Sequence, residues 1–191
     1  MNTKLEELLT NTPYDDVFRT LVNDCRELLL PLLNEVFGEH YTGDEQVILS
    51  ANEHFLNKTD GQEDKRVTDT TFLVVGKDGT RRYHWECQAV SDSTILLRLF
   101  EYDAQIALDN DGVLDGNVLT VTFPHTAVLY LRSTPETADR MTIRLVTPEG
   151  ETAYSVPVVK MQSFSLEQIF EKKLFFLLPF YIFNREKELP E

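Results

Sequence analysis

Apolar residues recur at helical spacing in the N-terminal part of the chain. They follow the pattern of an amphipathic helix at Val17, Phe18, Leu21, Val22, Cys25, Leu28, Leu29, Leu32 and Leu33. Asp15 or Asp16 is expected to cap the start of this helix, because a carboxylate accepts hydrogen bonds from its first free N–H groups. Pro31 is expected to kink or split the helix, and Gly38 to end it.

A strand–turn–strand pattern follows, after a polar stretch that holds a short strand at Val47–Leu49. Val67–Val75 is rich in Thr, Val and Phe, as strands are. Gly76–Gly79 has the composition of a tight turn, and Arg81–Val90 resumes the strand pattern. These segments predict a β-hairpin.

The next segment predicts a second helix, which extends to about Leu108. Ser91-Asp92-Ser93 is expected to cap its start, and Asn110-Asp111-Gly112 to end it. Its apolar stripe consists of Ile95, Leu96, Leu99, Phe100 and Ile106.

Short apolar runs after this helix predict further strands. Val118–Val121 and Ala127–Leu131 are expected to be short and buried, and Met141–Val146 and Thr152–Val159 flank a Pro-Glu-Gly turn as a second hairpin. Pro157 is expected to place the end of that hairpin at a sheet edge, because proline has no N–H to donate.

The C-terminal part predicts a last helix, Leu166–Leu178, which Ser165 caps and Pro179 breaks. The order of helix, strands, helix, strand, hairpin and helix predicts a mixed α/β fold. A chain of 191 residues fits a single domain, 1–191. Its core is expected at about 14–133, and its extension, with the second hairpin and the C-terminal helix, at about 140–186.

The composition argues against several classes of protein. The formal net charge is −14, so any contact with DNA is expected to be weak or local, since DNA binders neutralise phosphates. Cys25 and Cys87 lie outside any C-x-x-C pair, which predicts buried thiols in a reducing cytoplasm and no structural zinc. The N-terminus lacks the apolar core of a signal peptide, and Leu174–Phe183 is too short to span a bilayer, so no membrane association is expected.

The first hairpin places three polar side chains on one face. If the loop is Lys77–Asp78, Asp69 lies directly opposite Glu86; with the loop one residue later, Asp69 faces Gln88 and Glu86 lies on the diagonal. Both registers put the three on one face, because strand side chains alternate. The other face is expected to be the core face, with Phe72, Val74, Tyr83, Trp85 and Cys87.

Two opposed carboxylates need a counter-charge. They lie about 5 Å apart at Cβ and repel each other. Asp69 and Glu86, together with phosphate oxygens of a substrate, suit Mg²⁺, which activates water and stabilises charge on a phosphodiester. The plain alternative is a solvated polar strand face with a chance pair of acids.

At this point the motifs resemble a known family. Thr-Asp-Thr-Thr-Phe at 68–72, a turn, Trp-Glu-Cys-Gln at 85–88 and a helix with Leu-Leu-Arg-Leu-Phe-Glu-Tyr at 96–102 are similar to the PD-(D/E)XK nuclease superfamily. More narrowly, they resemble its recombination-promoting, transposase-like branch, in which Glu-x-Gln is a common form of the motif. The resemblance covers about 15–186 and implies a restriction-endonuclease-like αβββαβ core with a mixed sheet.

The resemblance implies roles for the motif residues. Asp69 and Glu86 would ligate Mg²⁺, with Mn²⁺ as an alternative and the Cys87 carbonyl as an extra ligand. Gln88 stands where many relatives have a catalytic lysine, and an amide donates hydrogen bonds without a charge. A second metal ion or another residue would then have to compensate.

A polar pair on the second helix is the candidate substrate-binding element. Arg98 and Tyr102 are four residues apart and share a helix face, as a phosphate clamp or a brace for the acidic site. The alternative is that Arg98 pairs with Glu101 or Asp92 while Tyr102 packs.

Weaker candidates are Glu27 and Glu35, expected to be exposed helical acids, and the Glu53-His54 pair. His84 shares the hairpin face of Glu86, but a lone histidine is more often a structural hydrogen-bonding residue, so it is left out of the site.

The first hypothesis for function is a Mg²⁺-dependent DNA endonuclease linked to recombination or mobile elements. The second is a catalytically weak or inactive nuclease-fold protein that acts as a binding or assembly module, with a homodimer left open. The third and weakest is an immunity or regulatory protein whose acidic surface mimics nucleic acid.

Overall fold

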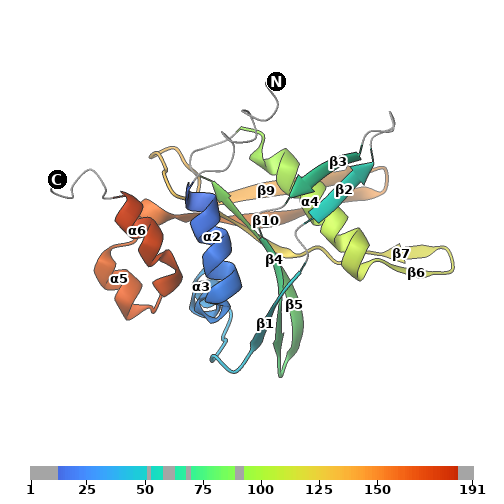
Figure 1. Ribbon diagram of the computed structural model, residues 1–191. Helices are drawn as coiled ribbons and strands as arrows, with labels where there is room; N and C mark the ends of the chain where they lie inside the picture. The colour runs from blue at the N-terminus through green and yellow to red at the C-terminus, as the bar shows by residue number, and fades with distance from the viewer. Residues whose placement is uncertain (1–12, 51–52, 58–62, 68–69, 89–92, 185–191) are drawn as a thin grey trace, which may run out of the picture.

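The computed structural model describes residues 13–50, 53–57, 63–67, 70–88 and 93–184. It is a mixed α/β protein in which helices cover both faces of a six-stranded sheet (Figure 1). The strand order is β1-β4-β5-β8-β10-β9. These strands are β1 (Gln46–Leu49), β4 (Thr70–Gly76), β5 (Gly79–Gln88), β8 (His125–Tyr130), β9 (Arg140–Thr147) and β10 (Gly150–Lys160).

Strand direction changes across the sheet. β1, β4 and β5 are antiparallel neighbours, whereas β5, β8 and β10 run parallel, and β9 closes the sheet antiparallel to β10. Two further ribbons are separate from it: β2 (Glu53–Asn57) with β3 (Glu63–Val67), and β6 (Val113–Asp115) with β7 (Val118–Thr120). The predicted mixed α/β plan is confirmed.

The predicted first hairpin is β4–β5. Gly76 pairs with Gly79 and Thr70 with Trp85, so the loop is Lys77–Asp78 and the first of the two predicted registers is correct. The predicted core face is buried under the N- and C-terminal helices, as the exposure of Phe72, Val74, Tyr83, Trp85 and Cys87 shows.

The N-terminal helical segment breaks earlier than predicted. It consists of α2 (Pro13–Asp24), the 3-10 turn η1 (Arg26–Leu28) and α3 (Leu29–Phe37). Pro31 lies in the first turn of α3, where its missing N–H needs no partner, so it does not split a helix. Asp15 and Asp16 lie inside α2 instead of capping it. Gly38 ends α3 with a φ of 70°, as predicted, because glycine tolerates the left-handed conformation.

The second helix, α4 (Ile95–Asp111), covers the opposite face of the sheet. Its Ile95 and Leu99 pack with Val128 and Val156 in a second core cluster. Its N-cap is Thr94, without a side-chain cap bond, so the predicted cap at Ser91–Ser93 is wrong.

Two strand predictions also need correction. Val118–Val121 is not a buried strand, because β7 pairs only with β6 in a ribbon whose residues are all exposed. Pro157 does not mark a sheet edge, since β10 lies between β8 and β9. It stands at the last residue pair with β9, just before the pairs with β8 begin at Val158.

The C-terminal segment is two short helices instead of one. Ser165 caps α5 (Leu166–Glu171) through a capping box with Gln168. The 3-10 turn η3 (Phe175–Leu177) then leads into α6 (Leu178–Asn184), and Pro179 lies in the first turn of α6 instead of breaking a helix.

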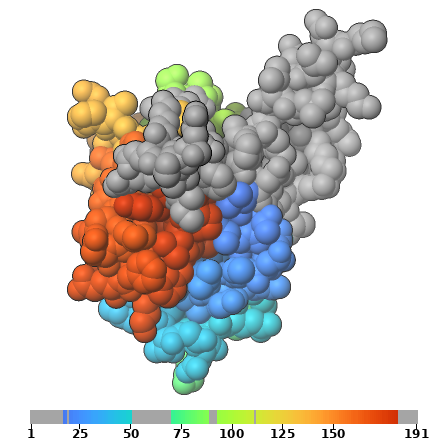
Figure 2. Space-filling view, turned by 60° about the vertical axis from the view of Figure 1, so that its left-hand side comes forward, coloured from blue at the N-terminus to red at the C-terminus, as the bar shows by residue number. Residues whose placement is uncertain are grey.

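The C-terminal helices pack beside the N-terminal ones (Figure 2). The rings of Phe18 and Phe176 meet edge to face at 5.5 Å. A further 3-10 turn, η2 (Met161–Ser163), joins β10 to this layer. Within the described residues, none of the helices is both long and apolar enough to cross a membrane.

Candidate functional site

The predicted motif residues Glu86 and Gln88 lie near the end of β5, on the face that α4 covers. Glu86 is only 4% exposed, and Gln88 is half-buried. In the register of β5 with β8, Glu86 lies beside Val128 and Gln88 beside Tyr130. Asp69, the predicted second carboxylate, lies outside the described residues.

The carboxyl ends of three parallel strands meet at this edge. Gln88, Tyr130 and Lys160 are register partners at the ends of β5, β8 and β10. Because Tyr130 and Val158 pack in the α4-side cluster, alternation places Lys160 on the same face. Its Nζ lies 2.7 Å from Oδ1 of Asp139, whose side chain is 90% exposed. Ligands of open α/β sheets bind at such carboxyl ends.

The side chain of Cys87 does not lie on the face of Glu86, so only its backbone carbonyl is a candidate metal ligand. The thiol is buried in the core cluster on the opposite face of the sheet. Leu131 donates its N–H to the Gln88 carbonyl, so that carbonyl faces β8. Successive carbonyls of a strand point to opposite sides, so the Cys87 carbonyl points to the β4 side. Its predicted role as a metal ligand stays a prediction.

The two residues of the predicted pair on α4, Arg98 and Tyr102, differ in burial. Arg98 is half-buried in the first turn of α4, where its backbone N–H donates to the Thr94 carbonyl. Tyr102 is buried, and its ring meets the His84 ring edge to face at 6.0 Å. Tyr102 therefore packs, as the alternative expected, and the phosphate-clamp role of both residues stays a prediction.

A buried polar network lies beneath α4. Nδ1 of His84 lies 2.7 Å from Oδ1 of Asp103, and neither side chain is exposed. The Thr126 hydroxyl donates to the same oxygen at 2.6 Å, and the Tyr154 hydroxyl donates to Oδ2 at 3.1 Å. Burial, followed by the charge of Asp103, raises the pKa of Tyr154 above its ordinary value, so its phenol remains a donor.

The network fixes the tautomer of His84. Asp103 accepts the hydroxyl of Thr126 on Oδ1 and that of Tyr154 on Oδ2, and its contact with His84 is a hydrogen bond of the same kind when Nδ1 carries the proton. The shared proton therefore lies on Nδ1 of His84. Nε2 of that ring is buried and has no hydrogen-bond partner among the described residues.

Sequence reasoning placed His84 on the correct face but missed Asp103. The available signal was the position of Asp103 in the stripe of α4, four residues after Leu99 and three before Ile106. A charged residue at a core position of a helix needs a buried partner.

The structure also places the weaker candidates, two of which belong to a ribbon that contacts α4. Glu27 and Glu35 are exposed, as expected, and Glu35 pairs with Lys172. Glu53 and His54 belong to β2, which pairs with β3.

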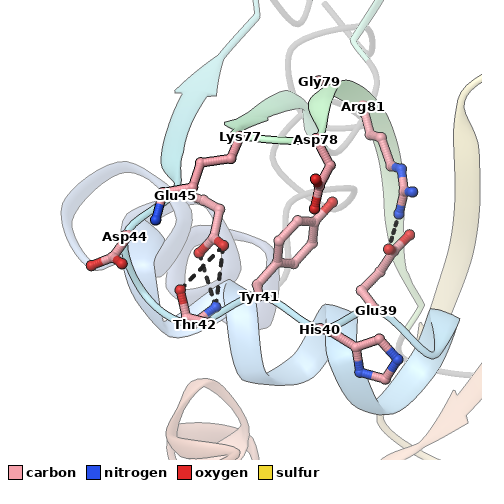
Figure 3. Close-up of a pocket in the computed structure, with 11 residues that line it drawn as sticks. Glu39, His40, Tyr41, Thr42, Asp44, Glu45, Lys77, Asp78, Gly79 and Arg81 are labelled. Carbon is pink, nitrogen blue, oxygen red and sulfur yellow. Dashed lines mark hydrogen bonds and ion pairs between the residues drawn. The ribbon is translucent and has the colours of Figure 1, made fainter.

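A separate hollow of about 280 Å³ lies at the far end of the β4–β5 hairpin (Figure 3). Glu39 pairs with Arg81 there. Desolvation acts to raise the pKa of Glu45, but N–H groups of Thr42 and Gly43 outweigh it and hold that pKa below its usual value. At about 3.3 Å per residue, this hollow is roughly 23 Å along β5 from Glu86, so it is no part of the predicted site.

The side chains near Glu86 include two that could act as ligands of a divalent cation. Among the described residues, no group of three or more His, Cys, Asp and Glu side chains could hold a metal ion, and Asp69 is not one of those residues. Glu86 and the unpartnered Nε2 of His84 project from the same face of one strand, two residues apart. These two side chains offer an oxygen and an imidazole nitrogen, donor types that divalent transition metals accept, and a cation there would need further ligands from outside the described residues.

Comparisons with known proteins found no matching family model, no matching curated protein and no matching solved structure. The site is therefore defined by the geometry of this chain alone: a buried carboxylate, a tautomer-fixed histidine and a row of polar side chains at the carboxyl ends of β5, β8 and β10.

Proposed function

We propose that this protein is a metal-dependent DNA endonuclease that hydrolyses phosphodiester bonds, linked to recombination or mobile elements. The observation that carries the proposal is the position of Glu86 and Gln88. Both project from one face of β5 near the carboxyl ends of parallel strands. When the separate ribbons β2–β3 and β6–β7 are set aside, the order of elements is helix, three strands, helix and strand: α2/α3, β1, β4, β5, α4 and β8. That order is the one the sequence resemblance implies.

The residues divide into two tasks. Glu86 and Asp69 would hold the cation, together with the Cys87 carbonyl. A divalent cation there supplies Lewis-acid stabilisation of the charge that develops on the phosphodiester. The Gln88 amide would donate a hydrogen bond to a phosphate oxygen.

Lys160 supports the proposal because it supplies the charge that Gln88 lacks. It stands in the same cross-strand row as Gln88, two strands away, at about 10 Å between backbones. A lysine side chain is long and flexible. Its ion pair with Asp139 is exposed on the Asp139 side, and such pairs contribute little stability, so the ammonium group can exchange that partner for a phosphate.

The test is nicking of supercoiled plasmid DNA with Mg²⁺ or Mn²⁺. The Asp69→Ala/Glu86→Ala double variant is expected to lose at least about a hundredfold in rate, because metal stabilisation of such charge amounts to several kcal/mol. Glu149→Ala, an exposed acid in the β9–β10 turn, is the matched control and should keep its activity. Cleavage that survives intact in the double variant would refute the proposal.

The second candidate is an inactive nuclease-fold protein that acts as an assembly module, and the ribbon β6–β7 favours it. Leu114 is 73% exposed and Leu119 is 56% exposed, and the two are register partners. Two such ribbons can bury these side chains against each other about a two-fold axis. The chain carries a net charge of −14, and an apolar contact brings no further like charges together at the interface.

Sedimentation equilibrium separates the two candidates. An assembly module predicts a dimer that the Leu114→Ser/Leu119→Ser variant converts to a monomer, together with no binding of Mg²⁺ or Mn²⁺ in calorimetry. The endonuclease predicts metal binding that depends on Glu86.

A further inference from the structure

The side chain of His84 has one nitrogen that the buried network does not use. Nδ1 is held by Asp103, whereas Nε2 is buried without a hydrogen-bond partner in the described part of the chain. A buried polar atom left without a partner destabilises the folded state. A histidine with a purely structural role would be expected to satisfy both nitrogens.

The network also sets the direction of that nitrogen. The two nitrogens of an imidazole point to nearly opposite sides of the ring. Asp103 meets Nδ1 where it also receives the hydroxyls of Thr126 from β8 and Tyr154 from β10. Nε2 therefore points away from β8, to the side of β5 on which β4 lies.

Glu86 is the nearest acidic residue along the same strand face. It follows His84 by two residues, so the two Cα atoms are separated by about 6.6 Å, twice the rise of a strand. Side chains at this spacing project in parallel from one face and can bind one cation between them.

We propose that Nε2 of His84 is a ligand of the divalent cation that Glu86 holds, and that the site consequently prefers a transition metal such as Mn²⁺ to Mg²⁺. The proposal rests on the metal site of the proposed function and names the kind of cation it takes.

The chemistry of the donors supports this assignment. Histidines that bind metals usually donate their other ring N–H to a carboxylate, which fixes the tautomer and the orientation of the ring. Asp103 does this here, and Thr126 and Tyr154 hold it in place. Imidazole nitrogen suits transition metals, whereas Mg²⁺ prefers oxygen ligands in a near-ideal octahedron.

The experiment is pulsed EPR of the full chain loaded with Mn²⁺, alongside calorimetric titrations with Mn²⁺ and Mg²⁺. The Mn²⁺ signal of the wild type should carry the ¹⁴N coupling of a bound imidazole. His84→Gln should lose that coupling and weaken Mn²⁺ binding at least about tenfold, with little change for Mg²⁺. His125→Gln is the control and should keep the coupling.

A second variant separates ligation from a folding defect. Asp103→Asn keeps His84 but replaces the carboxylate that orients it, and should weaken Mn²⁺ binding by about 10–100-fold, the usual effect of losing such a partner. A wild-type spectrum without ¹⁴N coupling would already overturn the role of His84, and that result does not depend on any variant folding.

The outcomes distinguish this proposal from the proposed function. In one outcome, the wild type binds Mn²⁺ without ¹⁴N coupling while Glu86→Ala loses the binding. That result overturns the role of His84 and leaves the endonuclease proposal intact. Coupling that persists in His84→Gln overturns it equally. Coupling in a protein that cleaves no DNA supports the ligand and refutes the endonuclease, whereas a wild type that binds no Mn²⁺ overturns both.

Discussion

Nδ1 of His84 lies 2.7 Å from Oδ1 of Asp103, and this contact joins strand β5 to helix α4 in an interior where neither side chain meets solvent. It ties the strand that carries Glu86 to the helix that covers it. Loss of the contact should therefore affect both folding and any chemistry at the end of β5.

The first prediction concerns the stability that Asp103 provides. Asp103→Ala should lower the free energy of unfolding by about 3 kcal/mol, because it leaves two buried groups, on His84 and Thr126, and the half-buried hydroxyl of Tyr154 without their acceptor. Asp109→Ala, an exposed site on the same helix, should change it little. Urea denaturation of both variants measures the difference, and an Asp103→Ala variant as stable as Asp109→Ala would show that the network contributes nothing.

The second prediction concerns alkaline pH. Burial, and next the hydrogen bond with Tyr41, raise the pKa of Tyr83 above its ordinary value. Because the pKa is raised in the folded state, the unfolded chain loses this proton first as the pH rises. The contribution of neutral Tyr83 to the free energy of unfolding is therefore fully present below about pH 10 and falls above it by about 1.4 kcal/mol per pH unit.

Urea denaturation at several pH values measures this slope. Tyr83→Phe should show a shallower loss of stability above about pH 10 than the wild type. Equal slopes in the two proteins would contradict the assignment. Tyr154, whose pKa burial and Asp103 also raise, should add to the slope of both.

The third prediction concerns Lys160 as the positive charge of the proposed site. Lys160→Gln should slow plasmid nicking by about a hundredfold, the lower end of the range expected when one group that stabilises developing charge is removed. Lys172→Gln, which removes an exposed ion pair with Glu35, should not. A Lys160→Gln variant that nicks at the wild-type rate would leave Gln88 without a compensating charge.

The fourth prediction concerns the ribbon β6–β7. Leu114→Ser/Leu119→Ser should change the free energy of unfolding of the monomer by less than about 0.5 kcal/mol, because both side chains are already exposed. Leu129→Ala, at a fully buried position of β8, should cost about 2–5 kcal/mol. A large loss in the double variant would mean that the ribbon packs within its own chain.

Local patterns in the sequence were enough for the elements that depend on neighbouring residues. Alternation placed Glu86 and Gln88 on one face of β5 in both registers that the sequence allowed, and the structure selects the one with the loop at Lys77–Asp78. The predictions that Pro31 and Pro179 interrupt a helix were wrong. Both residues lie in the first turn of a helix, where a missing N–H costs nothing, unlike in a helix interior.

The part of the site that was missed depends on long-range packing. Asp103 meets His84 only because β8 pairs beside β5 and α4 crosses above both. No local spacing relates residues 84, 103 and 154, so their convergence follows from the topology of the sheet. What the sequence did offer was a charge in the apolar stripe of α4, which indicates a buried partner without naming it.

The central claim is that the end of β5 holds a divalent cation at Glu86. Anomalous diffraction from crystals grown with Mn²⁺ tests it most directly. A manganese peak within bonding distance of a Glu86 carboxylate oxygen is the predicted result. Manganese bound elsewhere, with none at Glu86, would contradict the claim.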